Sequence, residues 1–240
     1  RVGDFIWAAA DMRTKGFLLG GTAGRTTLAG EGLQHQDGHS HLIASTVPNL
    51  KAYDPAFAYE IAVIINDGLL RMYKNQEDIF YYITLENENY IQPPMPQNAE
   101  EGIKKGMHCI YYGNKSSKRV QLLASGSMVN EAIEASKLLK SDWNIESDIW
   151  SVTSFSELHK EAEDKNRWNT LHPNKKDKIS YVSKCLRESN GPVIAVSDYV
   201  KLVAEQIAPY VNCPFSALGT DGFGRSETRE ELRTFFEVNR

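Results

Sequence analysis

The second half of the chain alternates short apolar, β-branched stretches with amphipathic helical segments, and this alternation restricts the possible folds more than any other feature. Strands that alternate with helices are joined by right-handed crossovers and form a parallel sheet that the helices cover. The expected strands are RVQLLAS, SDIWSVTS, GPVIAVSD and FSALG, in this order along the chain. The sequence therefore predicts an α/β domain with a parallel sheet in this half.

Three helices are expected between and after these strands. Residues 128–140 and 199–211 both show the apolar stripe of a helix that covers a core. Their expected inward residues are Val129, Ile133 and Leu138 in the first helix and Val200, Val203 and Ile207 in the second. We expect Asp198 to cap the second helix, and a capping box of Thr228 and Glu231 to begin the third.

The first third of the chain has the same kinds of element. Residues 4–13 are expected to form a helix and residues 17–21 a short buried strand. The expected inner face of that helix consists of Phe5, Ala8, Ala9 and Met12. A second helix is expected to begin with Asp54 as its cap and Pro55 at its first position. The aromatic and β-branched residues 79–84 predict a further strand.

A segment with three prolines and almost no apolar periodicity, LENENYIQPPMPQNAEEG, follows this strand. Such a composition is typical of a linker between domains. We therefore place a domain boundary near residue 95, between a first domain of residues 1–95 and a second of residues 96–240. The acids Glu86 and Glu88 in this segment are expected to be solvated.

Charge and cysteine content exclude several classes of protein. The chain has 27 Lys and Arg against 31 Asp and Glu, a net charge of −4, which favours neither nucleic acid nor an anionic membrane as a partner. No apolar run approaches the roughly 20 residues that a membrane helix needs. The cysteines Cys109, Cys185 and Cys213 are scattered, so we expect free thiols in a reducing compartment.

The segment GEGLQHQDGHSH gathers three histidines, His35, His39 and His41, with the acids Glu31 and Asp37. Imidazole and carboxylate are zinc ligands, so a zinc site is one interpretation. A solvated polar loop is a second. An acid/base or substrate-binding loop is a third, because histidine exchanges protons near neutral pH and glycines let a backbone approach a ligand closely.

Two further glycine-rich turns follow expected strands, ASGS at 124–127 and GTDGFGRSE at 219–227. A strand-to-helix turn of this kind either binds an anion through its free amide groups or only reverses the chain. His172 is expected to be structural. His108 and His159 stand alone in the sequence and carry no signal of function.

Long segments of the chain repeat a known pattern: GGTAGRTTLAGEGLQHQDGHSH, YDPAFAYEIAVIINDGLLRMY, YYITLENENY, SVTSFSEL, RWNTLHP and LGTDGFGRSETREELRTFFEV. Together they resemble the homodimeric bacterial pyruvate dehydrogenase family, the thiamin-diphosphate decarboxylase component of the pyruvate dehydrogenase complex. The resemblance runs from Arg1 to Arg240. The looser pattern GEG…HQ also resembles a loop of the transketolases, the parent superfamily.

This resemblance implies that residues 1–95 are the C-terminal part of a pyrimidine-binding domain. Residues 96–240 would form a transketolase C-terminal-type α/β domain, which we expect to be truncated. The family's diphosphate- and magnesium-binding domain and its cofactor-activating glutamate would lie upstream of Arg1. We therefore expect thiamin diphosphate and Mg²⁺ as cofactors, but assign no cofactor-binding or metal-ligating residue within this chain.

The family's activity, as the resemblance implies it, is an oxidoreductase reaction. Pyruvate is decarboxylated on thiamin diphosphate, and the lipoyl group of dihydrolipoyl acetyltransferase is reductively acetylated. His35 stands at the family's active-site histidine position, so we expect it to act as acid/base and to orient the substrate. Glu31 is expected to tune it or to close the hydrogen-bond network. His39, His41 and Asp37 match the motif without an assigned step. A homodimer in a multienzyme complex of the bacterial cytoplasm is expected.

Two alternatives remain open. The isolated chain, which is predicted to be inactive, would be a non-catalytic dimerisation or docking module. A zinc hydrolase built on the three histidines is the other alternative, and stoichiometric zinc in the purified protein would reveal it.

Overall fold

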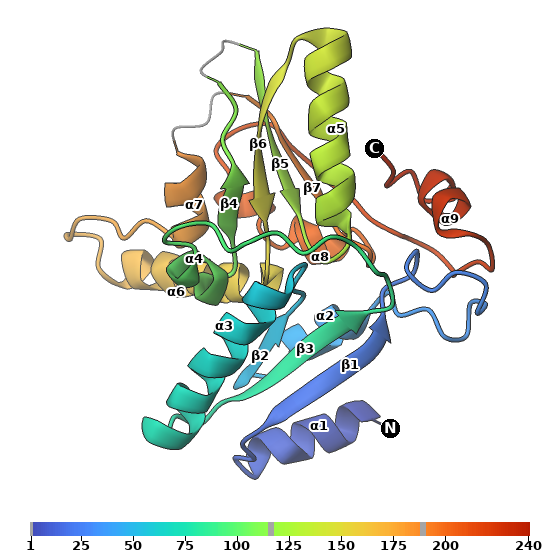
Figure 1. The fold of residues 1–240 in the computed structure, drawn as a ribbon. Coiled ribbons are helices and arrows are strands. Elements are labelled where there is room, and N and C mark those ends of the chain that lie inside the picture. Colours follow the sequence, from blue (N-terminus) through green and yellow to red (C-terminus); the bar gives the residue numbers. More distant parts are fainter. Residues whose placement is uncertain (1, 115–117, 188–190) are drawn as a thin grey trace.

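Two β-sheets organise the structure, a computed structural model that describes residues 2–114, 118–187 and 191–240. Each sheet belongs to one α/β unit, and Figure 1 shows the first unit below the second. The segment that follows the first sheet crosses the face of the molecule to reach the second unit. This is the three-proline segment.

The first sheet has the strand order β1-β3-β2, and all its strands are parallel. Its strands are β1 (Phe17–Ala23), β2 (Leu50–Tyr53) and β3 (Phe80–Glu86). Its helices are α1 (Val2–Asp11), α2 (Ser40–Ser45) and α3 (Ala58–Leu69), the last of which continues into a π-helical turn, Leu70–Lys74. The strand predicted at residues 79–84 is confirmed as β3.

The second sheet has the strand order β4-β6-β5-β7-β8. Its strands are β4 (His108–Tyr111), β5 (Arg119–Ala124), β6 (Glu146–Ser151), β7 (Val193–Val196) and β8 (Phe215–Leu218). The unit's helices are α4 (Glu100–Lys105), α5 (Met128–Trp143), α6 (Phe155–Leu171), α7 (Tyr181–Leu186), α8 (Leu202–Glu205), a 3₁₀ turn (Ala208–Tyr210) and α9 (Arg229–Phe235). The predicted α/β class is confirmed, but the sheet is mixed because the edge strand β4 runs antiparallel to β6.

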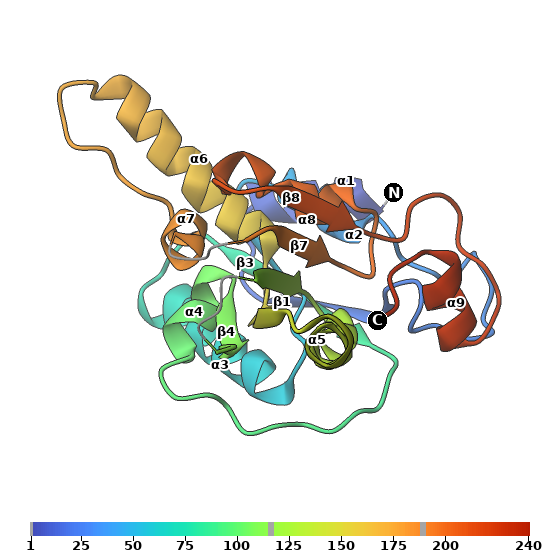
Figure 2. The same ribbon diagram turned by 90° about the horizontal axis from the view of Figure 1, so that it is seen from above.

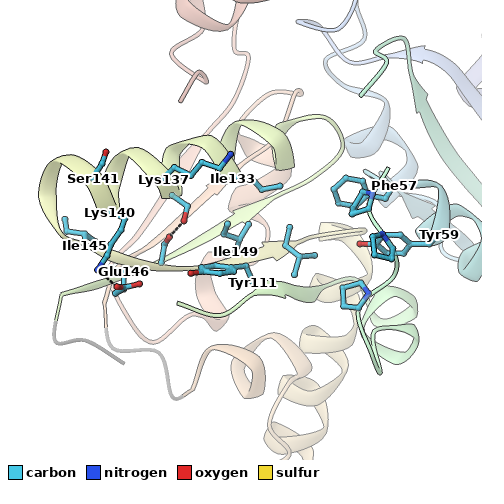
Figure 3. A pocket seen from close by; sticks show the side chains of 16 residues that line it. Phe57, Tyr59, Tyr111, Ile133, Lys137, Lys140, Ser141, Ile145, Glu146 and Ile149 are labelled. Atoms are coloured by element: carbon cyan, nitrogen blue, oxygen red, sulfur yellow. Dashed lines mark hydrogen bonds and ion pairs between the residues drawn. The ribbon is translucent and has the colours of Figure 1, made fainter. Parts of the chain in front are cut away.

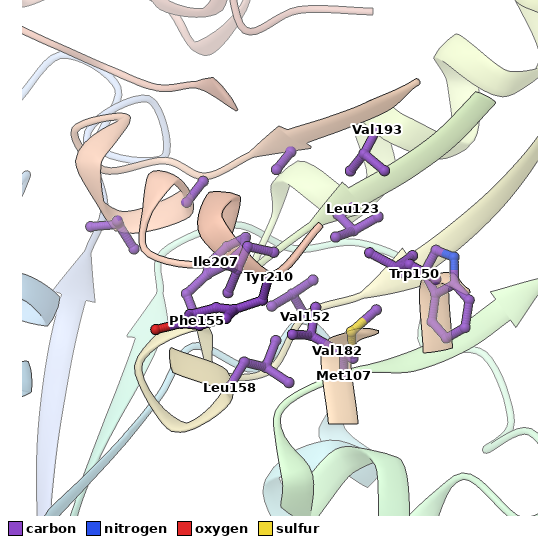
Figure 4. Close-up of a cluster of buried hydrophobic side chains, with 14 of the residues drawn as sticks. Met107, Leu123, Trp150, Val152, Phe155, Leu158, Val182, Val193, Ile207 and Tyr210 are labelled. Carbon is purple, nitrogen blue, oxygen red and sulfur yellow. The ribbon is translucent and has the colours of Figure 1, made fainter. Parts of the chain in front are cut away.

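Helices cover both faces of the second sheet. The larger buried cluster lies between the sheet and α6, α7 and α8, and includes Trp150, Phe155 and Ile207 (Figure 4). On the other face α5 and α9 pack on β5, β6 and β7, and Phe57 of the first unit joins this cluster. The two units therefore share core residues as well as a linker.

The start of α3 differs from the prediction. The helix begins at Ala58, and Oε2 of Glu60 accepts the backbone N–H groups of Ala56 (2.6 Å) and Phe57 (3.1 Å). Asp54 is therefore not the cap. Its carboxylate instead accepts hydrogen bonds inside the protein from neighbouring hydroxyl groups.

The predicted inner face of the first helix is wrong. Phe5 is 74% exposed and Met12 is 72% exposed, whereas Ala10 is buried and Ile6 packs beside it. The strand that follows is also less buried than expected, because β1 is an edge strand and leaves Leu19 59% exposed. Periodicity gave the right element types here and the wrong buried faces.

The helix predicted at 199–211 is broken into α8 and the 3₁₀ turn, although Val200, Val203 and Ile207 are buried as expected. The ring of Pro209 carries no amide hydrogen to continue the helical ladder. Asp198 does not cap this helix, since its carboxylate binds the amides of another loop. In α5 the expected inward Leu138 is 45% exposed. The Thr228 cap of α9 is confirmed, because its Oγ1 accepts the N–H of Glu231 at 3.3 Å.

The far end of α6 and the segment 172–179 project away from the rest of the molecule (Figure 2). Across the described ranges, no helix combines the length and the apolar character needed to cross a membrane.

Candidate functional site

The histidine loop, residues 24–41, follows β1 and lies beside α9 and the segment 219–227 (Figures 1 and 2). Gln36 joins the two segments, because its Nε2 donates to the carbonyl of Arg225 (2.6 Å) and its Oε1 accepts the N–H of Arg225 (2.9 Å). A Cβ atom on Gly224 would overlap Oε1 of Gln36, so a larger residue there would have to displace the amide of Gln36. The two glycine-rich segments that the sequence presents separately therefore form one surface.

His35 and Glu31 lie together on the exposed part of the histidine loop. Nδ1 of His35 is 3.3 Å from the carbonyl oxygen of Glu31 and 3.9 Å from its Oε2. The side chains are 60% and 48% exposed. The predicted pairing of these two residues is thus present in the geometry, with the imidazole presented to solvent and one ring nitrogen turned toward Glu31.

The other members of the motif have structural contacts. Oδ1 of Asp37 accepts the N–H groups of His39 and Ser40, both at 3.0 Å, at the start of α2. His41 is buried, and its Nε2 is 3.2 Å from Oγ1 of Thr84. Burial lowers the pKa of His41, which favours the neutral imidazole.

The three histidines do not form a metal centre in this arrangement. His35 faces outward while His41 is buried under the sheet edge. Within residues 2–114, 118–187 and 191–240, no group of three His, Cys, Asp or Glu side chains is placed to hold a metal ion. The zinc interpretation of the motif has no support from the geometry.

Asp198, which follows β7, is fully buried against the first turn of the histidine loop. Its Oδ2 accepts the backbone N–H groups of Arg25 (2.9 Å), Thr26 (3.0 Å) and Thr27 (3.3 Å), and its Oδ1 accepts that of Thr26 (3.0 Å). Burial raises the pKa of this carboxyl to about 6, although the amide donors and Arg233 favour its charged form.

Arg25 provides a second buried link between the loop and the segment 219–227. Its Nη1 donates to the carbonyl oxygens of Thr220 and Gly222, and only 3% of the residue is exposed. Burial lowers the pKa of the guanidinium, and the charge of Asp198 opposes this effect more than that of Asp221 or Asp37 does. A Cβ on Gly38 would overlap the guanidinium, so a larger residue at this position would have to displace the Arg25 side chain.

Buried acids meet where the two units join. Asp54 accepts hydrogen bonds from Oγ1 of Thr84 and Oγ of Ser125, both at 2.7 Å. Oε2 of Glu86 accepts the N–H of Ser127 at 2.5 Å, at the start of α5. Burial, with the carboxylates of Asp54 and Asp198, raises the pKa of Glu86 well above its ordinary value.

The expectation that Glu86 and Glu88 are solvated is therefore wrong. Oε1 of Glu86 is buried and has no hydrogen-bond partner in the described part of the chain. Glu88 pairs with Arg233 of α9. The two acids thus link the end of β3 and the segment after it to the start of α5 and to α9.

A cavity of about 620 Å³ adjoins the histidine loop. Arg25, Gln36 and His39 line it from the loop, and Asp221 and Phe223 from the opposite segment. The cavity is thus bounded by the histidine loop and the segment 219–227, and its polar groups include a guanidinium, an amide, the imidazole of His39 and a carboxylate. These groups are able to bind a polar or anionic molecule. His35 lies on the same loop but is not among the residues that line the cavity.

A second cavity, of about 600 Å³, lies between α5, the face of β6 and the three-proline segment (Figure 3). Its lining is mainly apolar, with Phe57 and Tyr59 at one end and Lys140 and Glu146 at the other. None of the residues that line it belongs to the histidine loop. The acid/base groups therefore favour the first cavity as the functional site.

Thiamin diphosphate with Mg²⁺ would need oxygen ligands for the metal and donors for the diphosphate. The described residues offer no cluster of three ligands for a metal, and the histidine loop offers acid/base groups instead. These residues do not fit a complete diphosphate and metal site, and we derive no chemical step through that group.

Arg25 and Asp198 belong to the site although neither is expected from the sequence. The available signal for Asp198 is its position directly after a strand, since the carboxyl ends of strands in an α/β sheet commonly carry functional groups. For Arg25, the only signal in the sequence is its position in a glycine-rich segment. The cluster of Asp54 and Glu86 has no local signal, because its members come from different strands.

Comparison with known families matches both units. Residues 1–93 match the family described as the pyruvate dehydrogenase E1 component middle domain. Residues 106–239 match the transketolase-like C-terminal domain.

Curated relatives match the whole chain. It is similar to the pyruvate dehydrogenase E1 component of Pseudomonas aeruginosa, with 58% identity over 242 residues, and to that of Escherichia coli K12, with 52% identity over 241 residues. Each match covers 100% of this chain and 27% of the relative, so the chain spans about a quarter of their length.

Solved structures of low sequence identity share the fold. The transketolase from Campylobacter jejuni has a TM-score of 0.70 and 18% identity, over 98% of this chain and 32% of that one. A split-gene transketolase, described as an inactive β4 tetramer, has a TM-score of 0.62 and 17% identity over 93% of this chain and 62% of that one.

Proposed function

Because this chain belongs to the transketolase-like C-terminal domain family and corresponds to a segment of pyruvate dehydrogenase E1 components, we propose that it is the acid/base-bearing part of a pyruvate dehydrogenase. The complete enzyme converts pyruvate, an oxidised lipoyl disulfide and one proton into carbon dioxide and an S-acetyl dihydrolipoyl group. One sulfur takes the acetyl group and the other is reduced to a thiol.

The contribution of this chain is proton transfer and orientation. His35 is the group that gives a proton to the leaving sulfur, because histidine exchanges protons near neutral pH. Glu31 holds one side of the ring, with its carbonyl oxygen 3.3 Å from Nδ1, which leaves Nε2 for the reacting groups. The single observation that carries the proposal is this exposed imidazole on a loop that buried contacts fix in place.

The cofactor of the complete enzyme is thiamin diphosphate with Mg²⁺, held mainly by residues outside this chain. Its partner is the lipoyl domain of the acetyltransferase component. The complete enzyme is a homodimer of the bacterial cytoplasm. Support for these statements comes from the relatives' names and from the resemblance of the histidine loop to that family.

The test uses the full-length protein with thiamin diphosphate and Mg²⁺. Pyruvate-dependent reductive acetylation of a lipoyl domain is measured for the wild type and for His35→Ala, with His172→Ala on the distant projection as the matched control. General acid/base loss is on the order of 10²–10⁴-fold in turnover. A loss of that size in His35→Ala alone supports the proposal, and wild-type turnover in His35→Ala contradicts it.

A second candidate function applies to the isolated chain. α1 exposes Phe5 (74%) and Trp7 (55%), the residue after it, Met12, is 72% exposed, and the edge strand β1 exposes Leu19. An apolar face beside an unpaired strand edge favours association. As an isolated chain, the protein would be a dimerisation module. Analytical ultracentrifugation compares the oligomeric state of the wild type with that of Phe5→Glu. Only a dimer whose interface lies on α1 dissociates with this change.

A further inference from the structure

We propose that Asp198 is the positioning residue of the site, which fixes the histidine loop by binding its first turn from the opposite α/β unit. The catalytic part of this inference rests on the proposed function of His35. The physical part, the attachment of the loop, does not depend on that function.

Asp198 binds the backbone of the first turn of the histidine loop. The carboxylate of Asp198 accepts three successive backbone N–H groups, those of Arg25, Thr26 and Thr27, at 2.9–3.3 Å. Successive amides around one anion form a nest, a backbone arrangement that binds negative charge. The attachment therefore needs no particular side chain on the loop, only the anion of Asp198.

Gly24 allows this close approach. Its φ of +84° lies in the left-handed region, and a Cβ at this position would overlap Oδ2 of Asp198. The N–H of Asp37, at the far side of the loop, donates to the carbonyl of Gly24 at 3.1 Å. The turn that Asp198 holds is thus joined to both ends of the segment that carries Glu31 and His35.

The loop has other anchors, and they come from the same unit. Val200 donates its N–H to the carbonyl of Gly38 at 3.1 Å, and Arg229 donates to that of Thr27 at 3.0 Å. Asp198 is nevertheless the only buried anion among the loop's anchors in the described residues. Removal of its charge leaves three buried amides with a weaker acceptor.

Charged groups from several elements face this carboxylate. Arg25 comes from the loop itself, Arg233 from α9 and Glu86 from the end of β3. Burial opposes the ionised form, whereas the amide donors and Arg233 favour it. The resulting pKa of about 6 means that Asp198 is mainly ionised at neutral pH and mainly protonated below pH 6.

The titration of Asp198 provides a test of the proposal, because a residue with a purely structural role would not make the loop depend on pH in this way. A protonated carboxyl uses one oxygen as a donor and so offers fewer acceptor sites to the three amides. Asn at this position imitates the protonated state at every pH. We therefore expect the wild-type loop to loosen below pH 6 and the loop of Asp198→Asn to be loose at every pH.

The experiment measures amide hydrogen exchange and kinetics on the full-length protein. Exchange of residues 25–38, corrected for the intrinsic effect of pH, is followed between pH 5 and pH 8 for the wild type and Asp198→Asn. Asp177→Asn, on the exposed projection, is the control. Lipoyl acetylation gives kcat and KM for pyruvate at pH 7.5.

We expect Asp198→Asn to exchange faster in residues 25–38 at pH 7.5 and to lose on the order of 10²-fold in kcat, as misplaced catalytic groups do. The KM for pyruvate should change little. Wild-type exchange and kcat in Asp198→Asn would overturn the proposal, as would a loss of kcat without faster exchange. If the wild type itself does not turn over pyruvate, the proposed function fails while the exchange data still decide the role of Asp198.

Discussion

Nε2 of His108 lies 2.7 Å from Oε1 of Glu60, and this buried pair joins β4 of the second unit to α3 of the first. The same Oε1 accepts the hydroxyl of Ser151 at 2.6 Å, while Oε2 caps α3. One glutamate therefore begins a helix in its own unit and binds two side chains of the other unit.

Loss of this pair should destabilise the contact between the units. The substitution of His108 removes one hydrogen bond from the buried carboxylate of Glu60, and a hydrogen bond to a charged group contributes about 1.5–3 kcal/mol. We expect His108→Ala to lower the free energy of unfolding by about that amount in urea denaturation, whereas Lys176→Ala on the exposed segment 172–179 changes it by less than about 0.5 kcal/mol. Equal effects of the two substitutions would show that the pair does not support the interface.

Two glycines of the histidine loop allow a matched test of backbone strain against crowding. Gly24 and Gly30 both have positive φ, +84° and +78°, but a Cβ on Gly30 meets nothing within 4 Å. Gly30→Ala should cost about 1 kcal/mol from the left-handed conformation alone. Gly24→Ala should cost more and should increase proteolysis of the loop, because Asp198 must move. Similar proteolysis of the two variants would contradict this expectation.

The buried Glu86 predicts a pH dependence of stability. Burial raises its pKa well above 4.5, so the folded protein keeps a proton that the unfolded chain has lost. This contribution is present at low pH and is lost as the pH rises through the native pKa. The free energy of unfolding of the wild type should therefore fall relative to Glu86→Gln as the pH rises from about 5 to 9. The exposed Glu100→Gln is the control, and parallel curves for all three proteins would argue against a buried proton.

Two tyrosines differ in whether their hydroxyl groups are satisfied. Oη of Tyr53 donates to the carbonyl of Lys104 at 2.7 Å, whereas Oη of Tyr59 is buried with no partner in the described residues. Tyr53→Phe should cost about 1 kcal/mol, and Tyr59→Phe should be neutral or slightly stabilising, since it removes an unsatisfied donor. Thermal unfolding of both variants measures the difference. A larger loss in Tyr59→Phe would mean that its hydroxyl does have a partner in solution.

Local sequence signals predicted the elements of this fold well. The strand at Phe80–Glu86 and the cap at Thr228 follow from residue types within a few positions. The buried faces of α1 and the role of Asp54 do not, because they depend on which strand lies at an edge and on groups that come from distant segments. Propensity and period describe a segment, whereas burial depends on its neighbours in space.

In the candidate site, too, contacts within one segment are predictable from the sequence, whereas contacts between distant segments are not. His35 and Glu31 are four residues apart, so one motif predicts their contact. Asp198 has the sequence signal of a helix cap, since it directly precedes an expected helix, yet it binds a loop from the other unit. A carboxylate after a strand fits both roles, and only the packing of the two units decides between them.

The attachment of the histidine loop also has a consequence for synthesis of the protein. Arg25 and Asp198 are 173 residues apart in the chain. At a translation rate of about 5–20 residues per second, Arg25 is synthesised roughly 9–35 s before Asp198. During that interval the glycine-rich backbone of the loop is without the carboxylate that holds it, which makes this segment a natural target for chaperones and proteases in the nascent chain.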